Sequence, residues 1–279
     1  MTMTDNNYAS KLDLLFMEWQ QRMRANGEVY YDEKGELAFT KDGIVYKNGE
    51  ENEQTDQNWT NSSKRILFLL KDQHQKRKEG ESFWSEDIRY WIKDVETDSD
   101  CALNQKRENR ELGNRFFKHL AYIFWGLSKA DLQNDWEYDE VVKSEYEVKE
   151  FFNAQPFALV ECKKQPGDGS LDDKILIRHL NEYGDMLIRE IEILEPNMIV
   201  CTSPHIYNFI NNAYQKQYSN DGLKRIDEKE HNSIRFHPKT QTLIFCSYHP
   251  SSFGKYGGKF NYDSVMDHYR AFLKSIYNL

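Results

Sequence analysis

The chain has 279 residues, and its 46 acidic and 37 basic side chains give a formal net charge of −9. Aromatic residues make up 14% of the chain, which excludes a disordered protein, since disordered chains are poor in aromatic residues. The longest apolar run, Ile66 to Leu70, is far too short to span a bilayer, and the first ten residues lack the pattern of a signal peptide, so we expect a cytoplasmic protein.

Residues 1–63 predict a helix followed by a hairpin, which we expect to form an extension outside the main domain. Between Tyr8 and Ala25, apolar residues recur at three- and four-residue spacing, which is typical of an amphipathic helix. From Val29 to Tyr46, aromatic and branched residues punctuated by glycine predict a hairpin. The polar stretch from Lys47 to Ser63 indicates a surface loop.

Four short apolar runs follow along the chain, and helical patterns separate them. A short apolar run that stops abruptly suits a strand buried on both faces of a parallel sheet. The runs are 65–70, 157–162, 198–201 and 242–247, and the helical patterns cover 87–95, 110–127, 171–194, 205–214 and 262–277. Strands that alternate with helices predict an α/β fold with a mostly parallel sheet, which we expect to form a domain over 64–279.

The cysteines do not have the spacing of a local metal site. Cys101, Cys162, Cys201 and Cys246 form no CxxC pair, and three of them lie within apolar runs. We therefore expect buried thiols, no metal and no cofactor.

The loops that follow the four predicted strands are the places to look for a site, because ligands of open α/β sheets bind at the carboxyl ends of the strands. These loops carry basic residues that would converge on one edge, namely Lys71, Lys76, Arg77, Lys78, Lys163, Lys164, Lys255 and Lys259. Their glycine and serine residues also free backbone amides that can hold phosphate oxygens. The alternative is that charged loops are simply solvated.

Two of these loops carry motifs that resemble a known family. Lys71-Asp-Gln-His74 follows the first strand and His249-Pro-Ser251 follows the fourth. Their order and placement resemble the two signature motifs of the uracil-DNA glycosylase superfamily, and the resemblance covers roughly residues 64–279. It implies a three-layer α/β/α fold around a short, mostly parallel four-stranded sheet. It also implies that DNA is the partner and that the N-glycosidic bond of a flipped base is hydrolysed.

The resemblance carries roles to individual residues. Asp72 matches the residue that positions or activates water, and His249 matches the donor to the base carbonyl, where negative charge develops. Glu161 stands where the family usually has an Asn that reads the base edge, and His74 is the one residue of the first motif that can stack on the base. The residues expected to contact phosphate or the DNA stack are Lys71, Lys163, Lys164, Ser251, Ser252, Phe253 and Lys255, with Phe253 as the apolar wedge.

Two alternatives stay open. The first motif lacks the usual Gly and Pro, which favours a non-catalytic module that binds a nucleobase, a nucleotide or nucleic acid on the same fold. An unrelated small-molecule enzyme is the other alternative, since a fold does not determine a function. Structural roles also exist for the candidates: Asp72 as a helix N-cap, Glu161 in a salt bridge with Lys163 or Lys164. The net charge of −9 weakens long-range attraction to DNA, although a basic edge can still bind phosphate locally.

Overall fold

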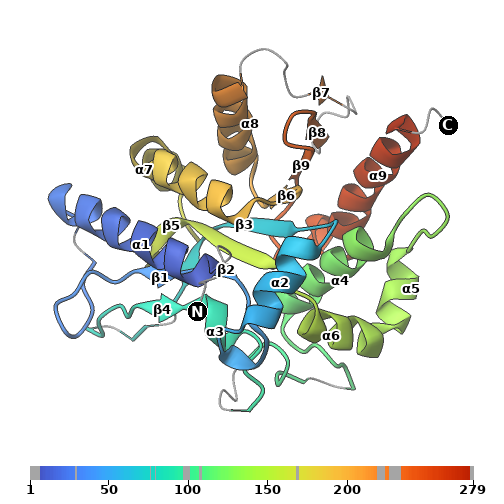
Figure 1. The fold of residues 1–279 in the computed structure, drawn as a ribbon. Helices are drawn as coiled ribbons and strands as arrows, with labels where there is room; N and C mark the ends of the chain where they lie inside the picture. The colour runs from blue at the N-terminus through green and yellow to red at the C-terminus, as the bar shows by residue number, and fades with distance from the viewer. Residues whose placement is uncertain are drawn as a thin grey trace.

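Seven described strands form one mixed sheet through the centre of the molecule (Figure 1). The computed structural model describes residues 7–28, 30–75, 77–78, 80–96, 101–106, 109–167, 170–218, 224–225 and 234–276. The strands follow the order β2-β5-β3-β6-β9-β8-β7 across the sheet. Their bounds are β2 Gly43–Ile44, β3 Ile66–His74, β5 Ala158–Gly167, β6 Met198–Cys201, β7 Lys224–Arg225, β8 Ile234–His237 and β9 Thr242–Cys246. Strands β1 (Thr40–Lys41) and β4 (Glu86–Asp87) form a separate parallel pair.

The four central strands β5, β3, β6 and β9 are the ones that the apolar runs predict, and they run parallel to one another. The α/β fold class is therefore confirmed. The expected sheet of four strands is too small, because β2 adds an antiparallel strand beside β5, and β8 and β7 continue the sheet beyond β9. These added strands are short or amphipathic, so the sequence contains no continuous apolar run that would predict them.

Helices cover both faces of the sheet (Figure 1). Their bounds are α1 Tyr8–Ala25, α2 Glu53–Asn61, α3 Ile88–Trp91, α4 Arg115–Lys129, α5 Tyr138–Lys143, α6 Glu145–Ala154, α7 Asp173–Leu194, α8 Pro204–Tyr218 and α9 Lys259–Ile276, with single 3-10 turns at Lys47–Gly49 and Gly254–Tyr256. The sequence patterns predict α1 at its observed bounds and α7, α8 and α9 nearly so. They miss α5 and α6, and they extend α3 well beyond its four residues.

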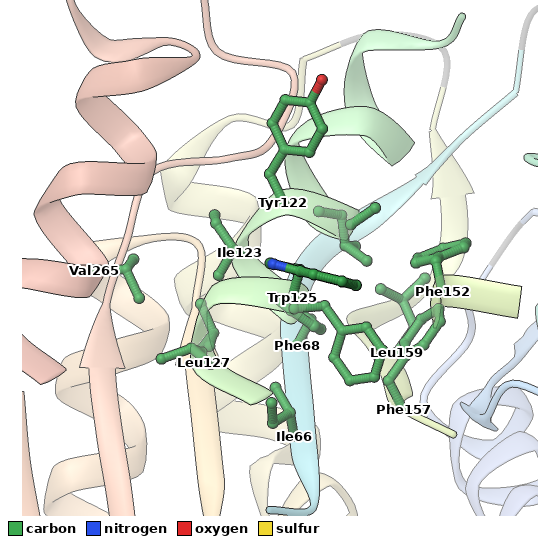
Figure 2. Packing of buried hydrophobic residues seen from close by; sticks show 14 of the residues in the cluster. Ile66, Phe68, Tyr122, Ile123, Trp125, Leu127, Phe152, Phe157, Leu159 and Val265 are labelled. Carbon is green, nitrogen blue, oxygen red and sulfur yellow. The ribbon is translucent and has the colours of Figure 1, made fainter. Parts of the chain in front are cut away.

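Two apolar cores form because side chains alternate along the strands. On β3, Phe68 points toward α4 and α9, whereas Leu67 and Leu69 point toward α1, α7 and α8. Figure 2 shows the first core, in which Phe68 lies among Trp125 and the aromatic residues around β5. The two cores place the sheet in the middle of three layers and hold the carboxyl ends of its parallel strands at one edge.

The described part of residues 1–63 packs on the sheet. Helix α1 lies against α7, and β2 pairs with β5. The expected hairpin is wrong for the described residues, because β1 and β2 pair with distant strands and only Tyr31 and Leu37 bridge locally. The expected loop over 47–63 is also wrong, since it contains α2, whose Trp59 is fully buried and donates its indole N–H to the carbonyl of Leu194 at 2.9 Å. The division at residue 63 stays a prediction.

Candidate functional site

A cavity of about 580 Å³ lies at the carboxyl ends of β3 and β5. The start of α7 forms one wall, and the segment before β1 forms another. The residues that line the cavity include Tyr30, Asp72, Phe83, Lys163, Gly167 and Arg178. This is the edge where ligands of open α/β sheets bind. The structure therefore places a cavity where the sequence predicts a site, and it brings Asp72 and Lys163 together there.

Asp72 and Lys163 face each other across neighbouring strands. They are register partners of β3 and β5, and Lys163 Nζ lies 3.6 Å from Asp72 Oδ2. Their side chains are only 6% and 4% exposed. Burial raises the pKa of Asp72 and lowers the pKa of Lys163, and in each case the opposite charge of the partner counters the shift without cancelling it. Both shifts favour the neutral pair, in which the proton lies on Asp72 and not on Lys163, more than the same two groups would in water.

Lys163 is also held by backbone. Its ammonium donates to the carbonyl oxygens of Gln165 and Pro166, the latter at 3.2 Å. Gly167 is the last residue of β5, and a Cβ built on it would lie 2.5 Å from Asp72 Oδ2. A side chain at residue 167 would therefore displace the Asp72 carboxylate, which explains why a glycine suits this end of β5.

Aromatic side chains form another wall of the cavity. Tyr30 and Phe83 meet edge to face with ring centroids 5.0 Å apart, and the Arg77 guanidinium lies 3.5 Å from the Phe83 centroid. Arg178 lines this cavity and also a second cavity of about 800 Å³, which shares Tyr30 with the first. Flat aromatic surfaces beside cations suit a heterocyclic ring that carries anionic groups.

Glu161 and Lys164 are buried and line neither of the two cavities. Lys164 Nζ lies 2.5 Å from Asp42 Oδ1 and 2.8 Å from Glu190 Oε2, with all three side chains fully buried. Although burial alone would lower it, these carboxylates raise the pKa of Lys164. The expected phosphate contact of Lys164 does not fit this position, because its charge is already neutralised in the interior.

Glu161 is 2% exposed, and its backbone N–H donates to Asp42 Oδ2 at 2.7 Å. Burial raises the pKa of Glu161 well above its usual range, and Asp72 and Asp42 raise it further. The expected reading of a base edge by Glu161 does not fit this position. Alternation along β5 explains why the two adjacent lysines separate: successive residues of a strand point to opposite faces, so Lys163 reaches the cavity and Lys164 does not.

His249 lies at the same edge of the sheet but does not line the cavity around Asp72. Its ring is 5.5 Å from that of Phe116, and its Nδ1 accepts the Ser251 N–H at 3.2 Å. Burial and the charge of Lys71 lower its pKa to about 4. At neutral pH His249 is therefore uncharged, and because Nδ1 accepts, Nε2 carries the hydrogen and can donate it.

The other expected contacts are mostly on the surface. His74, Ser251, Phe253 and Lys255 are exposed, and Phe253 is 79% exposed. Ser252 is half-buried. Lys71 is half-buried and pairs with Asp173 at 2.7 Å. Lys76, expected on the basic rim, lies outside the described residues.

Sequence reasoning missed Tyr30, Phe83 and Arg178. Tyr30 comes from the segment that the sequence assigns to an extension, and Arg178 lies a full turn inside α7. No local signal marks them, because they reach the cavity only through the packing of distant segments.

The four cysteines are all buried thiols, as expected. Within the described residues, no cluster of three or more His, Cys, Asp or Glu side chains is arranged to hold a metal ion. The helices described here include none that is both long and apolar enough to cross a membrane. No family model matches the chain, and no curated protein matches it either.

Proposed function

We propose that the cavity at the ends of β3 and β5 takes up a nucleobase with its sugar, and that the protein hydrolyses the N-glycosidic bond of a flipped base in DNA. The observation that carries the proposal is the buried Asp72 carboxylate on the wall of an aromatic-lined cavity, at the strand end where the first family-like motif lies. The three layers and the position of His249 after β9 agree with the fold that the resemblance implies.

In the proposed reaction the base lies against the ring of Tyr30 or Phe83, and water enters beside Asp72. The carboxylate orients this water and accepts its proton as the water oxygen bonds to the sugar carbon. The bond between that carbon and the base nitrogen breaks with its electron pair passing to the base. Lys163 keeps the carboxylate in place, and its positive charge favours the ionised form of Asp72. General-base assistance of this kind contributes about 10²–10⁴-fold in rate.

His249 is the proposed donor to the departing base. Its uncharged ring with hydrogen on Nε2 suits donation to a carbonyl that gains negative charge. Because His249 does not line the cavity, this role requires the flipped base and the loop after β9 to come closer to each other.

A non-catalytic binding module is the second candidate. The separation of His249 from the cavity and the burial of Glu161 favour it, since two of the expected contacts to the base do not line the cavity. Tyr30, Phe83 and Arg178 would suffice to bind a nucleobase or nucleotide without hydrolysis.

The test is base release from labelled single-stranded and duplex DNA that carries uracil, hypoxanthine, xanthine or a mismatch, with the free base measured by chromatography. Asp72→Asn should lower the release rate by about a hundredfold or more while leaving DNA binding intact. The matched control is Asp172→Asn, since Asp172 lines the same cavity as the N-cap of α7, where Asn caps equally well. This variant should release base at the wild-type rate.

Equal base release by Asp72→Asn and wild type would contradict the hydrolytic proposal. Absence of release from every substrate, together with DNA binding that weakens steeply as salt is added, would favour the binding module.

A further inference from the structure

Lys163 is a second reactive group on the cavity wall, and the hydrolysis described above does not use its nitrogen as a nucleophile. We propose that Lys163 forms an imine with the aldehyde of the abasic sugar that remains after base removal. This inference rests on the proposed function in one respect, namely that the cavity admits the deoxyribose of DNA.

The contacts of Lys163 Nζ suit an amine that gives up the one proton facing Asp72. An ammonium group has three N–H donors, and Nζ has three acceptors around it: the carbonyls of Gln165 and Pro166, and the Asp72 carboxylate at 3.6 Å. When the third proton passes to Asp72, the neutral amine keeps both carbonyl partners. Its lone pair then lies on the side of Nζ that faces Asp72, which lines the same cavity.

The electrostatic surroundings favour that transfer. Burial lowers the pKa of Lys163 and raises that of Asp72, so both shifts reduce the cost of moving the proton between them. The adjacent Lys164 shows the contrast within the same strand, because two carboxylates bracket it and raise its pKa. Of these two buried lysines, only Lys163 both lines the cavity and has a lowered pKa.

The chemistry balances without an added reagent. The Lys163 nitrogen adds to C1′ of the open-chain sugar, and the electron pair of the carbonyl bond moves to oxygen, which takes a proton from the nitrogen. Loss of water from this carbinolamine gives the imine. The imine acidifies C2′: when the C2′–H proton leaves to solvent, a C2′=C3′ double bond forms as the C3′–O bond breaks and releases the 3′ phosphate. Water then hydrolyses the imine and regenerates the lysine.

The test uses the full chain and an oligonucleotide with a preformed abasic site, so that no glycosylase activity is needed. Borohydride reduces an imine to a stable amine, and a covalent protein–DNA adduct should appear on a denaturing gel. Lys163→Arg keeps the positive charge opposite Asp72 but cannot form the imine, so the adduct should fall to background. When borohydride is left out, the wild-type protein should nick the strand at the abasic site even though no alkali is added.

Lys64→Arg is the matched control. Lys64 also donates to backbone carbonyls, those of Leu127, Ser128 and Ala130, and burial lowers its pKa to about 8, but it lies outside the cavity. This variant should give as much adduct as wild type. Peptide mapping of the wild-type adduct should place the sugar on Lys163 even if Lys163→Arg folds poorly.

An adduct on another lysine, an undiminished adduct in well-folded Lys163→Arg, or no adduct with wild type would overturn the inference. The two proposals fail separately. Base release without an adduct would contradict only the proposed imine. An adduct without base release would contradict only the proposed hydrolysis.

Discussion

Lys93 is buried beside two aromatic rings, and its ionisation should affect the stability of the fold. Its ammonium donates to the carbonyl of Gln155 at 2.7 Å and lies 4.7 Å from the centroid of Phe157. Burial lowers its pKa from 10.5 to about 7, and the charge of Lys47 adds to the shift. The folded chain therefore binds fewer protons than the unfolded chain between these two values of pH.

The sign of this linkage predicts that the free energy of unfolding rises with pH above about pH 7. The slope contributed by Lys93 is about 1.4 kcal/mol per pH unit, because one extra proton binds to the unfolded chain. Urea unfolding of Lys93→Met at pH 7, 8 and 9 should show a slope smaller by this amount. Parallel pH profiles of the variant and the wild type would show that Lys93 stays charged in the folded protein.

Gly167 limits the space around the Asp72 carboxylate. Gly167→Ala places a methyl carbon 2.5 Å from Asp72 Oδ2, well inside van der Waals contact. We expect Asp72 to shift and base release to fall, with a much smaller effect on the melting temperature than on the rate. Ser170→Ala, which trims a side chain on the same cavity wall, is the control. Wild-type rates for Gly167→Ala would mean that the position of Asp72 is not critical.

At the scale of elements, the turn between β1 and β2 is tied to β5 by buried charge. Asp42 accepts from Lys164 Nζ at 2.5 Å and from the backbone N–H of Glu161 at 2.7 Å. Without Asp42, Lys164 would keep only Glu190 of the two carboxylates that pair with it, and the buried Glu161 N–H would lose its acceptor. Breaking a buried ion pair in this way costs about 3–5 kcal/mol. These contacts join the segment before residue 63 to the central sheet.

Asp42→Ala should therefore lower the free energy of unfolding by about 3 kcal/mol or more in denaturant titrations. The adjacent Lys41 provides a control, because its ion pair with Asp13 is half-exposed. Lys41→Ala should cost less than about 1 kcal/mol. Similar losses in the two variants would argue that the buried cluster adds little to stability.

The sequence predicts well those helices and strands whose buried face shows as a local periodic pattern of apolar residues. The apolar stripe of α1 and the runs of β3, β5, β6 and β9 require no knowledge of the rest of the fold. Helix α2 escapes this reasoning because Trp59 is its one large apolar side chain, and β2 is too short to show a pattern. Their structure depends on partners that lie far away in the sequence.

At the scale of the whole molecule, the position of the cavity was predictable and its composition was not. Parallel strands place their carboxyl ends together, so the sequence points to the edge where Asp72 lies. The sequence does not show that Lys163 and Lys164 have opposite environments, or that Tyr30 and Phe83 form a wall. It also does not show that His249 lies outside that wall.

The α/β class, the four parallel strands and the edge where the cavity lies could be predicted from the amino-acid sequence, because each follows from apolar patterns a few residues long. Which polar side chains reach the cavity could be seen only in the folded molecule. That selection depends on strand register, on the face to which each residue points and on segments that meet across more than a hundred residues. Asp72 and Lys163 meet through register, and the contacts of Lys163 Nζ distinguish it from the lysine beside it.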